Sequence, residues 1–183
     1  MRAVILVFSL SFTSQAMAGC GKLCDGEWWK TATTADLQAE LDAGANVMAQ
    51  TNDGAKPLHY ASQQGTTETI KALLAAGADI TAQHECGSTP LRSAAANGTT
   101  ETIKALLASG ADVMAEDADG WTPLHRAASC FSCESENIQI LLAAGASVTA
   151  TGEDDKKPLD YAKENRRIKE TKGHLALKAA QQN

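Results

Sequence analysis

Hydrophobic residues recur at helical spacing along most of the chain, in short runs that glycine interrupts. Ile103, Leu106 and Leu107 sit at positions i, i+3 and i+4, which places them on one face of a helix. Leu91 and Ala95 form a similar stripe in a shorter segment just before it. The pattern predicts pairs of short amphipathic helices joined by turns.

Start and stop signals flank each of these helices. In the pair just described, Thr89 can cap the first helix with its hydroxyl, and Pro90 suits the first helical position because it lacks an N–H. Gly98 follows that helix, and we expect it to end the helix in the left-handed conformation that glycine adopts freely. Gly110 is expected to end the second helix in the same way.

The helix pairs repeat with a fixed period of 33 residues. The stretch from Gly65 to Asp79 returns from Gly98 to Asp112 with fourteen of fifteen positions identical. A period of this size predicts stacked repeats, each too small to bury its own apolar face. Other positions keep the same step: Gly54, Gly87 and Gly120; Pro57, Pro90 and Pro123; Leu58, Leu91 and Leu124.

One stretch identifies the kind of repeat. Residues 122–127 read T-P-L-H-R-A, which matches the ankyrin signature T-P-L-H-x-A at every position. The chain therefore resembles the ankyrin repeat family over roughly residues 31–165. The resemblance implies an all-α repeat solenoid, built from helix-turn-helix units with β-hairpin loops between them. It also implies that the motif residues His59 and His125 bond the backbone between repeats. Arg92 replaces this histidine in the second repeat.

The period divides the chain into three full repeats with a capping unit at each end. At the N-terminal end only the second-helix pattern is recognisable, and we expect Trp28 and Trp29 to cover the first core layer. The predicted units are a signal peptide (1–18), a Cys/Trp segment (19–30), an N-terminal capping half-repeat (31–49), repeats 50–82, 83–115 and 116–150, the last with a two-residue insertion, and a C-terminal capping repeat (151–183).

The first residues read as a secretory signal. Arg2 precedes a short apolar run, and Ala16-Met17-Ala18 forms an A-x-A cleavage pattern. We therefore expect export, to a bacterial periplasm. Residues 17–20 also resemble a lipobox, so a lipid anchor on Cys20 is the alternative. No other stretch could span a membrane.

Composition limits the function. The formal net charge is −6, which disfavours nucleic acid, because phosphate binding needs clustered Lys and Arg. The sequence contains no G-x-S-x-G, phosphate-loop or H-E-x-x-H motif. We therefore predict no catalytic residues, no cofactor and no metal site. The expected function, as the family resemblance implies, is binding to an unidentified protein, and we expect the module to be a monomer.

The family resemblance implies partner binding on the hairpin tips and the first-helix faces, which form an extended concave surface in stacked repeats. The tips here differ from repeat to repeat while the frame stays constant. The later tips are acidic. Trp121 is a candidate anchor, with packing on the adjacent hairpin as the alternative. The predicted binding residues are Asn52, Asp53, Lys56, His84, Glu85, Asp117, Asp119, Trp121 and Asp154.

Five cysteines are present, and export would permit disulfides. Two local bonds are predicted, Cys20–Cys24 ahead of the tryptophans and Cys130–Cys133 within the insertion. Cys86 is then left as a free thiol. The alternative function is a thiol-dependent redox protein that uses Cys86 or the Cys130/Cys133 pair.

Overall fold

The structure is a computed structural model that describes residues 20–130, 135–152, 154–166, 168–169 and 171–182. The predicted signal peptide lies outside these residues. A short 3₁₀ helix, η1 (Gly21–Cys24), comes first. The α-helices are α1 (Gly26–Trp29), α2 (Thr34–Asp42), α3 (Pro57–Gln64), α4 (Thr67–Ala75), α5 (Pro90–Asn97), α6 (Thr100–Ala108), α7 (Pro123–Ser129), α8 (Ser135–Ala143), α9 (Pro158–Glu164) and α10 (Lys172–Gln182).

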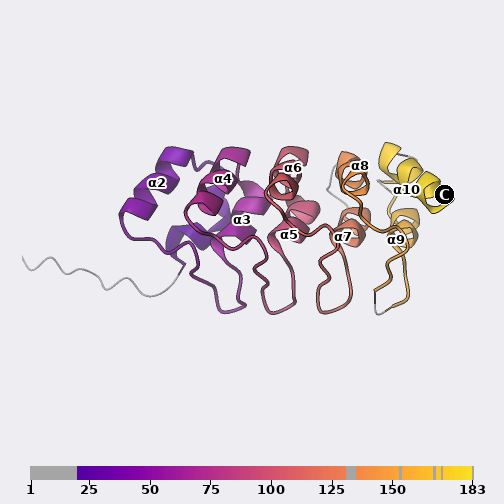
Figure 1. The fold of residues 1–183 in the computed structure, drawn as a ribbon, viewed down its shortest axis with the longest axis horizontal. Helices are drawn as coiled ribbons and strands as arrows, with labels where there is room; N and C mark the ends of the chain where they lie inside the picture. Colours follow the sequence, from indigo (N-terminus) through magenta and orange to yellow (C-terminus); the bar gives the residue numbers. More distant parts are fainter. Residues whose placement is uncertain (1–19, 131–134, 153, 167, 170, 183) are drawn as a thin grey trace, which may run out of the picture.

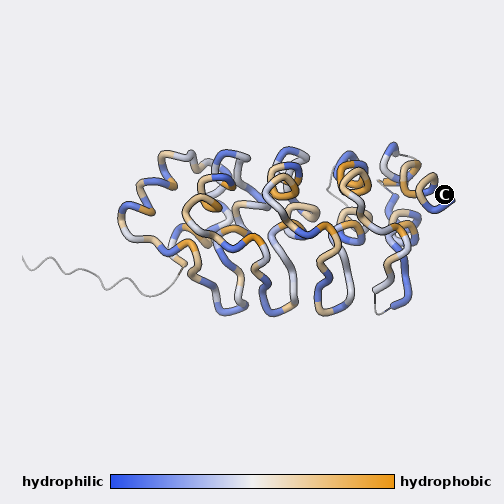
Figure 2. Tube along the Cα trace, viewed as in Figure 1, coloured by the Kyte–Doolittle hydropathy of each residue, from blue (hydrophilic) through white to orange (hydrophobic). Residues whose placement is uncertain are grey.

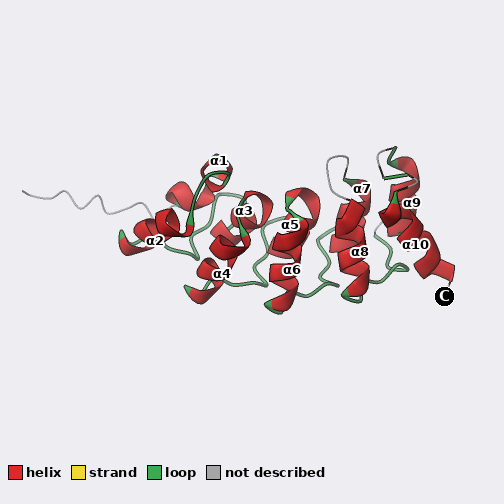
Figure 3. Ribbon diagram, turned by 90° about the horizontal axis from the view of Figure 1, so that it is seen from above, coloured by secondary structure: helices red, strands yellow, loops and turns green. Residues whose placement is uncertain are grey.

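The helices stand in two parallel rows that run the length of an elongated molecule (Figure 1). Helices α3, α5, α7 and α9 pack on one another in sequence, and α2, α4, α6, α8 and α10 form the second row (Figure 3). Long loops leave the first row on one side, and these loops are largely hydrophilic (Figure 2). The predicted all-α repeat solenoid is confirmed.

The hairpins between units are loops, and the described residues include no β-strand. Each hairpin is nevertheless closed by a backbone hydrogen bond at the same register. The amide of Thr51 donates to Ala55 O at 2.9 Å, and the amide of Asp117 donates to Trp121 O at 3.1 Å. The expected hairpins are therefore present as closed turns whose paired arms are too short to form strands.

The N-terminal capping unit has a first helix that the sequence pattern did not reveal. Helix α1 packs against α3, so it continues the row of first helices. Trp29 is buried there, and its indole N–H donates to Leu23 O at 2.8 Å. Asp25 caps α1 by accepting the amide of Glu27 at 2.9 Å. The cap therefore draws on the Cys/Trp segment as well as on residues 31–49.

The core lies between the two rows of helices. The second row contributes large aliphatic side chains such as Ile70, Leu73 and Leu106, all fully buried. The first row contributes small residues such as Ala94 and Ala95, which let neighbouring helices approach closely. A single apolar cluster extends from Leu23 to Leu177, so each unit shares its core with its neighbours.

Gly98 departs from the expectation for a helix-ending glycine. Its φ is −82°, which is outside the left-handed region, so the expected left-handed stop is wrong at this position. A Cβ atom at Gly98 would lie 2.5 Å from Ser62 O and 2.9 Å from Ala94 Cα. Close approach of the neighbouring repeat therefore explains this glycine. Gly110, with φ of 93°, does end its helix in the left-handed conformation.

Both motif histidines link one repeat to the next, as expected. The Nδ1 atom of His59 accepts the amide of Lys56 at 3.1 Å, and its Nε2 atom lies 2.9 Å from Ser88 O in the next hairpin. His125 repeats the arrangement, with the amide of Thr122 at 3.1 Å and Lys156 O at 3.2 Å. Both side chains are at most 1% exposed. These histidines hold the hairpins in place.

Truncation of Leu106 to Ala should lower the free energy of unfolding by about 2–5 kcal/mol. The side chain is fully buried on α6, which packs against both α4 and α8. Urea unfolding of the purified protein measures the change. Lys104→Ala, on the exposed face of the same helix, is the matched control and should stay within about 0.5 kcal/mol of the parent. Equal losses in the two variants would contradict this packing.

Stability should fall as the pH drops from about 6.5 toward 5. Burial is the main cause that lowers the pKa of both His59 and His125 in the folded protein. As the pH falls, these histidines therefore take up protons in the unfolded chain before they do so in the folded protein. Their contribution to the free energy of unfolding is complete above the unfolded pKa and is lost as the pH falls below it. Urea unfolding between pH 7.5 and 5 should show this slope, and His59→Asn with His125→Asn should flatten it. An unchanged slope in the double variant would contradict the assignment.

Candidate functional site

The first three hairpin tips are bonded to one another and form one continuous surface. The amide of Glu85 in the second tip donates to Asp53 O in the first tip at 2.9 Å. The amide of Ala118 in the third tip donates to Cys86 O in the second tip at 3.1 Å. Groups carried on different tips are therefore held at fixed spacing.

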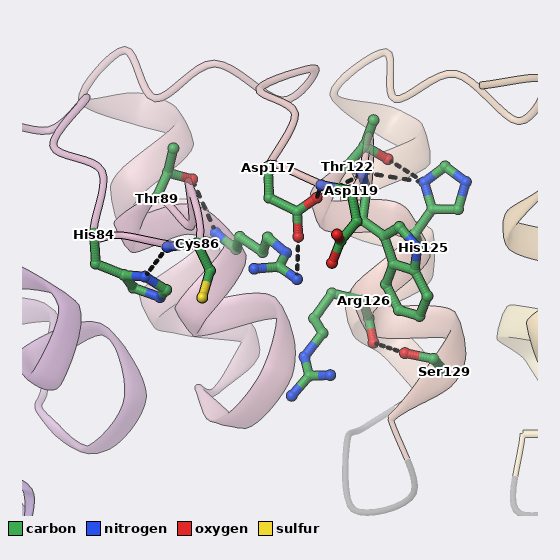
Figure 4. Close-up of polar contacts among 11 residues, drawn as sticks. His84, Cys86, Thr89, Asp117, Asp119, Thr122, His125, Arg126 and Ser129 are labelled. Atoms are coloured by element: carbon green, nitrogen blue, oxygen red, sulfur yellow. Dashed lines mark hydrogen bonds and ion pairs between the residues drawn. The ribbon is translucent and has the colours of Figure 1, made fainter. Parts of the chain in front are cut away.

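A hollow of about 360 Å³, open to solvent, lies between the second and third tips and the helices α5 and α7 beneath them. We call it the tip groove. Figure 4 shows several of its side chains, among them His84, Cys86, Asp117, Asp119 and Arg126. Its lining combines a thiol, a histidine, two arginines and two aspartates: Gln63, His84, Cys86, Ser88, Arg92, Ser93, Ala96, Asn97, Asp117, Asp119 and Arg126.

An ion pair across the groove replaces the histidine link of the other repeats. Arg92, on α5, pairs with the carboxylate of Asp117 in the next tip. The two side chains are 15% and 1% exposed. Asp117 also accepts the amides of Asp119 at 2.9 Å and Trp121 at 2.8 Å. The second repeat therefore keeps a link to the next hairpin although Arg replaces His. The histidines bond to a backbone carbonyl, whereas Arg92 bonds to the carboxylate of Asp117.

The second arginine of the groove is used differently. Arg126, on α7, is exposed, and its guanidinium has no ion pair with any residue that the structure describes. Burial lowers the pKa of the neighbouring Arg92, and the positive charge of Arg126 lowers it further. The two guanidinium groups are thus close enough to repel each other, although Asp117 and Asp119 offset part of the repulsion.

Cys86 is an exposed, free thiol on the wall of the groove, as the cysteine count predicted. The backbone amide of Cys86 donates to Nδ1 of His84 at 3.1 Å, and both residues belong to the second tip. No group of three or more His, Cys, Asp or Glu side chains within the described segments is arranged to hold a metal ion. The redox alternative that names Cys86 stays a prediction.

The remaining predicted binding residues lie at three tips. Asn52 and Asp53 are exposed on the first tip, beside the exposed Glu85 of the second. Lys56 lies half-buried at the start of α3. Asp154, on the fourth tip, accepts a hydrogen bond from the Tyr161 hydroxyl, and this bond is the main cause that lowers the pKa of Asp154. Only His84, Asp117 and Asp119 of the predicted set line the tip groove.

Trp121 lies half-buried between the third and fourth tips. Its ring centroid is 4.5 Å from that of Tyr161, and a Cβ atom at Gly152 would lie 2.8 Å from the indole ring. This placement corresponds to the alternative in which Trp121 packs on the adjacent hairpin. A large part of the indole is thus already occupied by contacts within the chain.

The structure brings Cys20 and Cys24, the first predicted cysteine pair, together. The sulfur atoms of Cys20 and Cys24 are in bonding contact, with the Cα atoms 5.1 Å apart. Sγ of Cys130 lies 2.9 Å from Ala96 O in the preceding repeat. Cys133, the predicted partner of Cys130, lies outside the described residues, so that pairing stays a prediction.

Sequence reasoning missed Arg126 and the role of Arg92 in the groove. Arg92 was visible as a departure from the motif histidine, and Arg126 occupies the variable x position of T-P-L-H-x-A. The replacement of the motif histidine could have pointed to Arg92, and the variable position of the motif could have pointed to Arg126. Their joint placement depends on the stacking of two repeats, which the sequence pattern of either repeat alone does not reveal.

Loss of the buried ion pair should destabilise the fold. Asp117→Ala leaves the guanidinium of Arg92 without its carboxylate and two tip amides without their acceptor, so the free energy of unfolding should fall by about 3–5 kcal/mol. Urea unfolding measures the loss. Asp119→Ala, an exposed carboxylate in the same tip, is the matched control and should change stability far less. A loss at Asp117 no larger than at Asp119 would show that the pair is weak.

Comparison with known proteins supports the assignment of the repeats. None of the curated proteins matches the chain. Among the described residues, no helix has the length and apolar character to cross a bilayer. The family described as "Ankyrin repeats (3 copies)" matches residues 58–152, which is more than half of the chain. This stretch contains the helix pairs α3/α4, α5/α6 and α7/α8 together with the tip groove, and the chain belongs to the ankyrin repeat family.

Proposed function

We propose that this protein is an exported, non-catalytic binding module and that its partner protein docks on the tip groove and the neighbouring tips. Ankyrin repeats generally mediate protein–protein interaction. The observation that carries the proposal is the continuous surface of the first three tips, which presents exposed charged groups around an open groove. A rigid surface of this kind loses little conformational freedom when a partner binds.

The titratable groups of the repeats support binding over catalysis. Both ring nitrogens of His59 and of His125 are engaged with backbone groups, so neither ring presents a free nitrogen to a substrate. Cys86 lies in a hairpin tip rather than at a helix N-terminus, where the helix dipole would favour the thiolate. These placements give the chemistry-bearing residues structural or surface roles.

Two features support export, the signal-like N-terminus and the first cysteine pair. The sulfur of Cys20 is buried and in contact with that of Cys24, and a disulfide there would form in an oxidising compartment such as the periplasm. The same sulfur is the atom that a lipid anchor would need. We therefore favour cleavage after Ala18 without lipidation, and the intact mass of the exported protein distinguishes the two outcomes.

Site-specific photo-crosslinking in the native host tests the docking surface. A photoreactive residue in place of Glu85, exposed on the second tip, should crosslink to the partner, while the same residue in place of Glu101 should not. Glu101 is an exposed glutamate on α6 in the other row of helices, so the two replacements match in charge and exposure. Mass spectrometry identifies the adduct. A partner captured from Glu101 and never from Glu85 would place the interface on the opposite face and overturn the proposal.

A further inference from the structure

Of the two arginines that line the tip groove, Arg92 has an ion-pair partner among the described residues and Arg126 does not. The side chain of Asp117 is 1% exposed, forms an ion pair with Arg92 and accepts two backbone amides, so its charge is compensated within the fold. Arg126 is exposed and has no anionic partner among the described residues. One cation of the groove is therefore committed to structure, and the other is available to a ligand.

The position of Arg126 in the repeat supports this division. The corresponding residues of the other units are Tyr60, Ser93 and Tyr161, so no packing rule of the repeat requires arginine there. Figure 4 shows the Arg126 side chain extending from α7 toward the second repeat, on whose tip Cys86 lies. The arginine thus reaches into the groove and is not part of the shared frame.

A second donor in the groove also lacks a partner. The Nε atom of Arg92 is buried and makes no hydrogen bond within the described part of the chain. Guanidinium groups donate in a planar fork that matches the two oxygens of a carboxylate, and such bonds are among the stronger ones in proteins. A carboxylate is therefore the ligand group that suits the exposed guanidinium of Arg126, whereas the buried Nε of Arg92 has no surface open to a ligand.

The rim limits how much negative charge the groove accepts. Asp119, which lines the groove, and Glu85, the neighbour of Cys86 in the second tip, are exposed carboxylates. Neither forms an ion pair with a described residue. These charges repel a polyanion while leaving room for one carboxylate near Arg126. They disfavour a phosphorylated or polyacidic ligand and favour a single acidic side chain in a mixed segment.

We propose that the tip groove binds one Asp or Glu side chain of the partner protein, with Arg126 as the primary ion-pair donor. This inference rests on the proposed function, since it specifies what the docking surface recognises. Cys86 lies on the wall of the same groove and provides a built-in attachment point for a direct test.

Disulfide tethering to Cys86 tests the proposal on the intact mature protein. Peptides Ac-X-Cys-NH₂ and Ac-X-Ala-Cys-NH₂ are supplied as disulfides, with X as Glu, Gln or Lys, and compete at equal concentration under a thiol buffer. The Cys86 thiolate attacks the peptide disulfide, the new S–S bond forms, and the other thiolate leaves and takes up a proton from the buffer. Intact-mass spectrometry counts the adducts. The Glu peptide should exceed the Gln peptide by about two- to fivefold, as an exposed ion pair allows.

Three variants give the controls. Cys86→Ser defines adducts that form at the other cysteines. Arg126→Gln should remove the preference for Glu over Gln, and Lys104→Gln, which deletes an exposed cation on α6, should retain it. Equal capture of the Glu and Gln peptides, a preference for Lys, or a preference for Glu that survives in Arg126→Gln would each overturn the proposal.

This test is separate from the test of the docking surface. Tethering uses no partner, so a negative result removes the carboxylate specificity and leaves crosslinking from Glu85 free to support docking at the tips. The two tests can also disagree in the other direction. Tethering could show a preference for Glu that depends on Arg126 while the partner crosslinks only from Glu101. The carboxylate site would then lie away from the partner interface. That combination would overturn the assignment of the carboxylate to the partner.

Discussion

The structure depends on a side-chain bridge from the first helix of each of the three repeats to the next hairpin. In the first repeat, His59 reaches Ser88 O at 2.9 Å, and in the third, His125 reaches Lys156 O at 3.2 Å. In the second repeat, Arg92 pairs with Asp117 of the following tip. No unit of this size can bury its apolar face alone, so contacts between neighbours determine whether the array is stable. The bridges set the register of those contacts on the hairpin side, while the shared core sets it on the helix side.

The same constraint produces the groove. Because the tips are tied to the helices and to one another, the space between the second and third tips keeps its shape. The replacement of His by Arg at position 92 requires an acidic partner, and Asp117 meets that requirement while its oxygens also hold two tip amides. The structural ion pair then leaves Arg126 as the uncommitted cation. Fold and candidate function are linked at this one departure from the repeat pattern.

The repeats could be predicted because their signal is periodic. Leu73 and Leu106 recur at the same step and point into the same core, so the helices and their stacking follow from the pattern. Helix α1 could not be predicted in this way, because four residues are too short to show a helical period, and packing of Trp29 stabilises it. The role of Gly98 depends on Ser62 O, an atom of the preceding repeat, so no local rule for helix ends could identify it.

The candidate site was predicted only in part for the same physical reason. Variation at the tips marked His84, Asp117 and Asp119, which do line the groove. Arg126 was missed because its importance depends on which charges nearby are already paired, and pairing is a property of the assembled stack. Trp121 was a plausible anchor by composition, yet its ring packs against Tyr161 in the next unit.

Amide hydrogen exchange tests most directly the claim that the tips form one bonded surface. The amides of Glu85 and Ala118 donate to the preceding tip, whereas the equivalent amide of Asn52 in the first tip has no such tip before it and makes no hydrogen bond to a described residue. The account predicts strong protection at Glu85 and Ala118 and fast exchange at Asn52. Exchange at all three amides near the rate of an unfolded chain would contradict it, because the tips would then move independently and the groove would have no fixed shape.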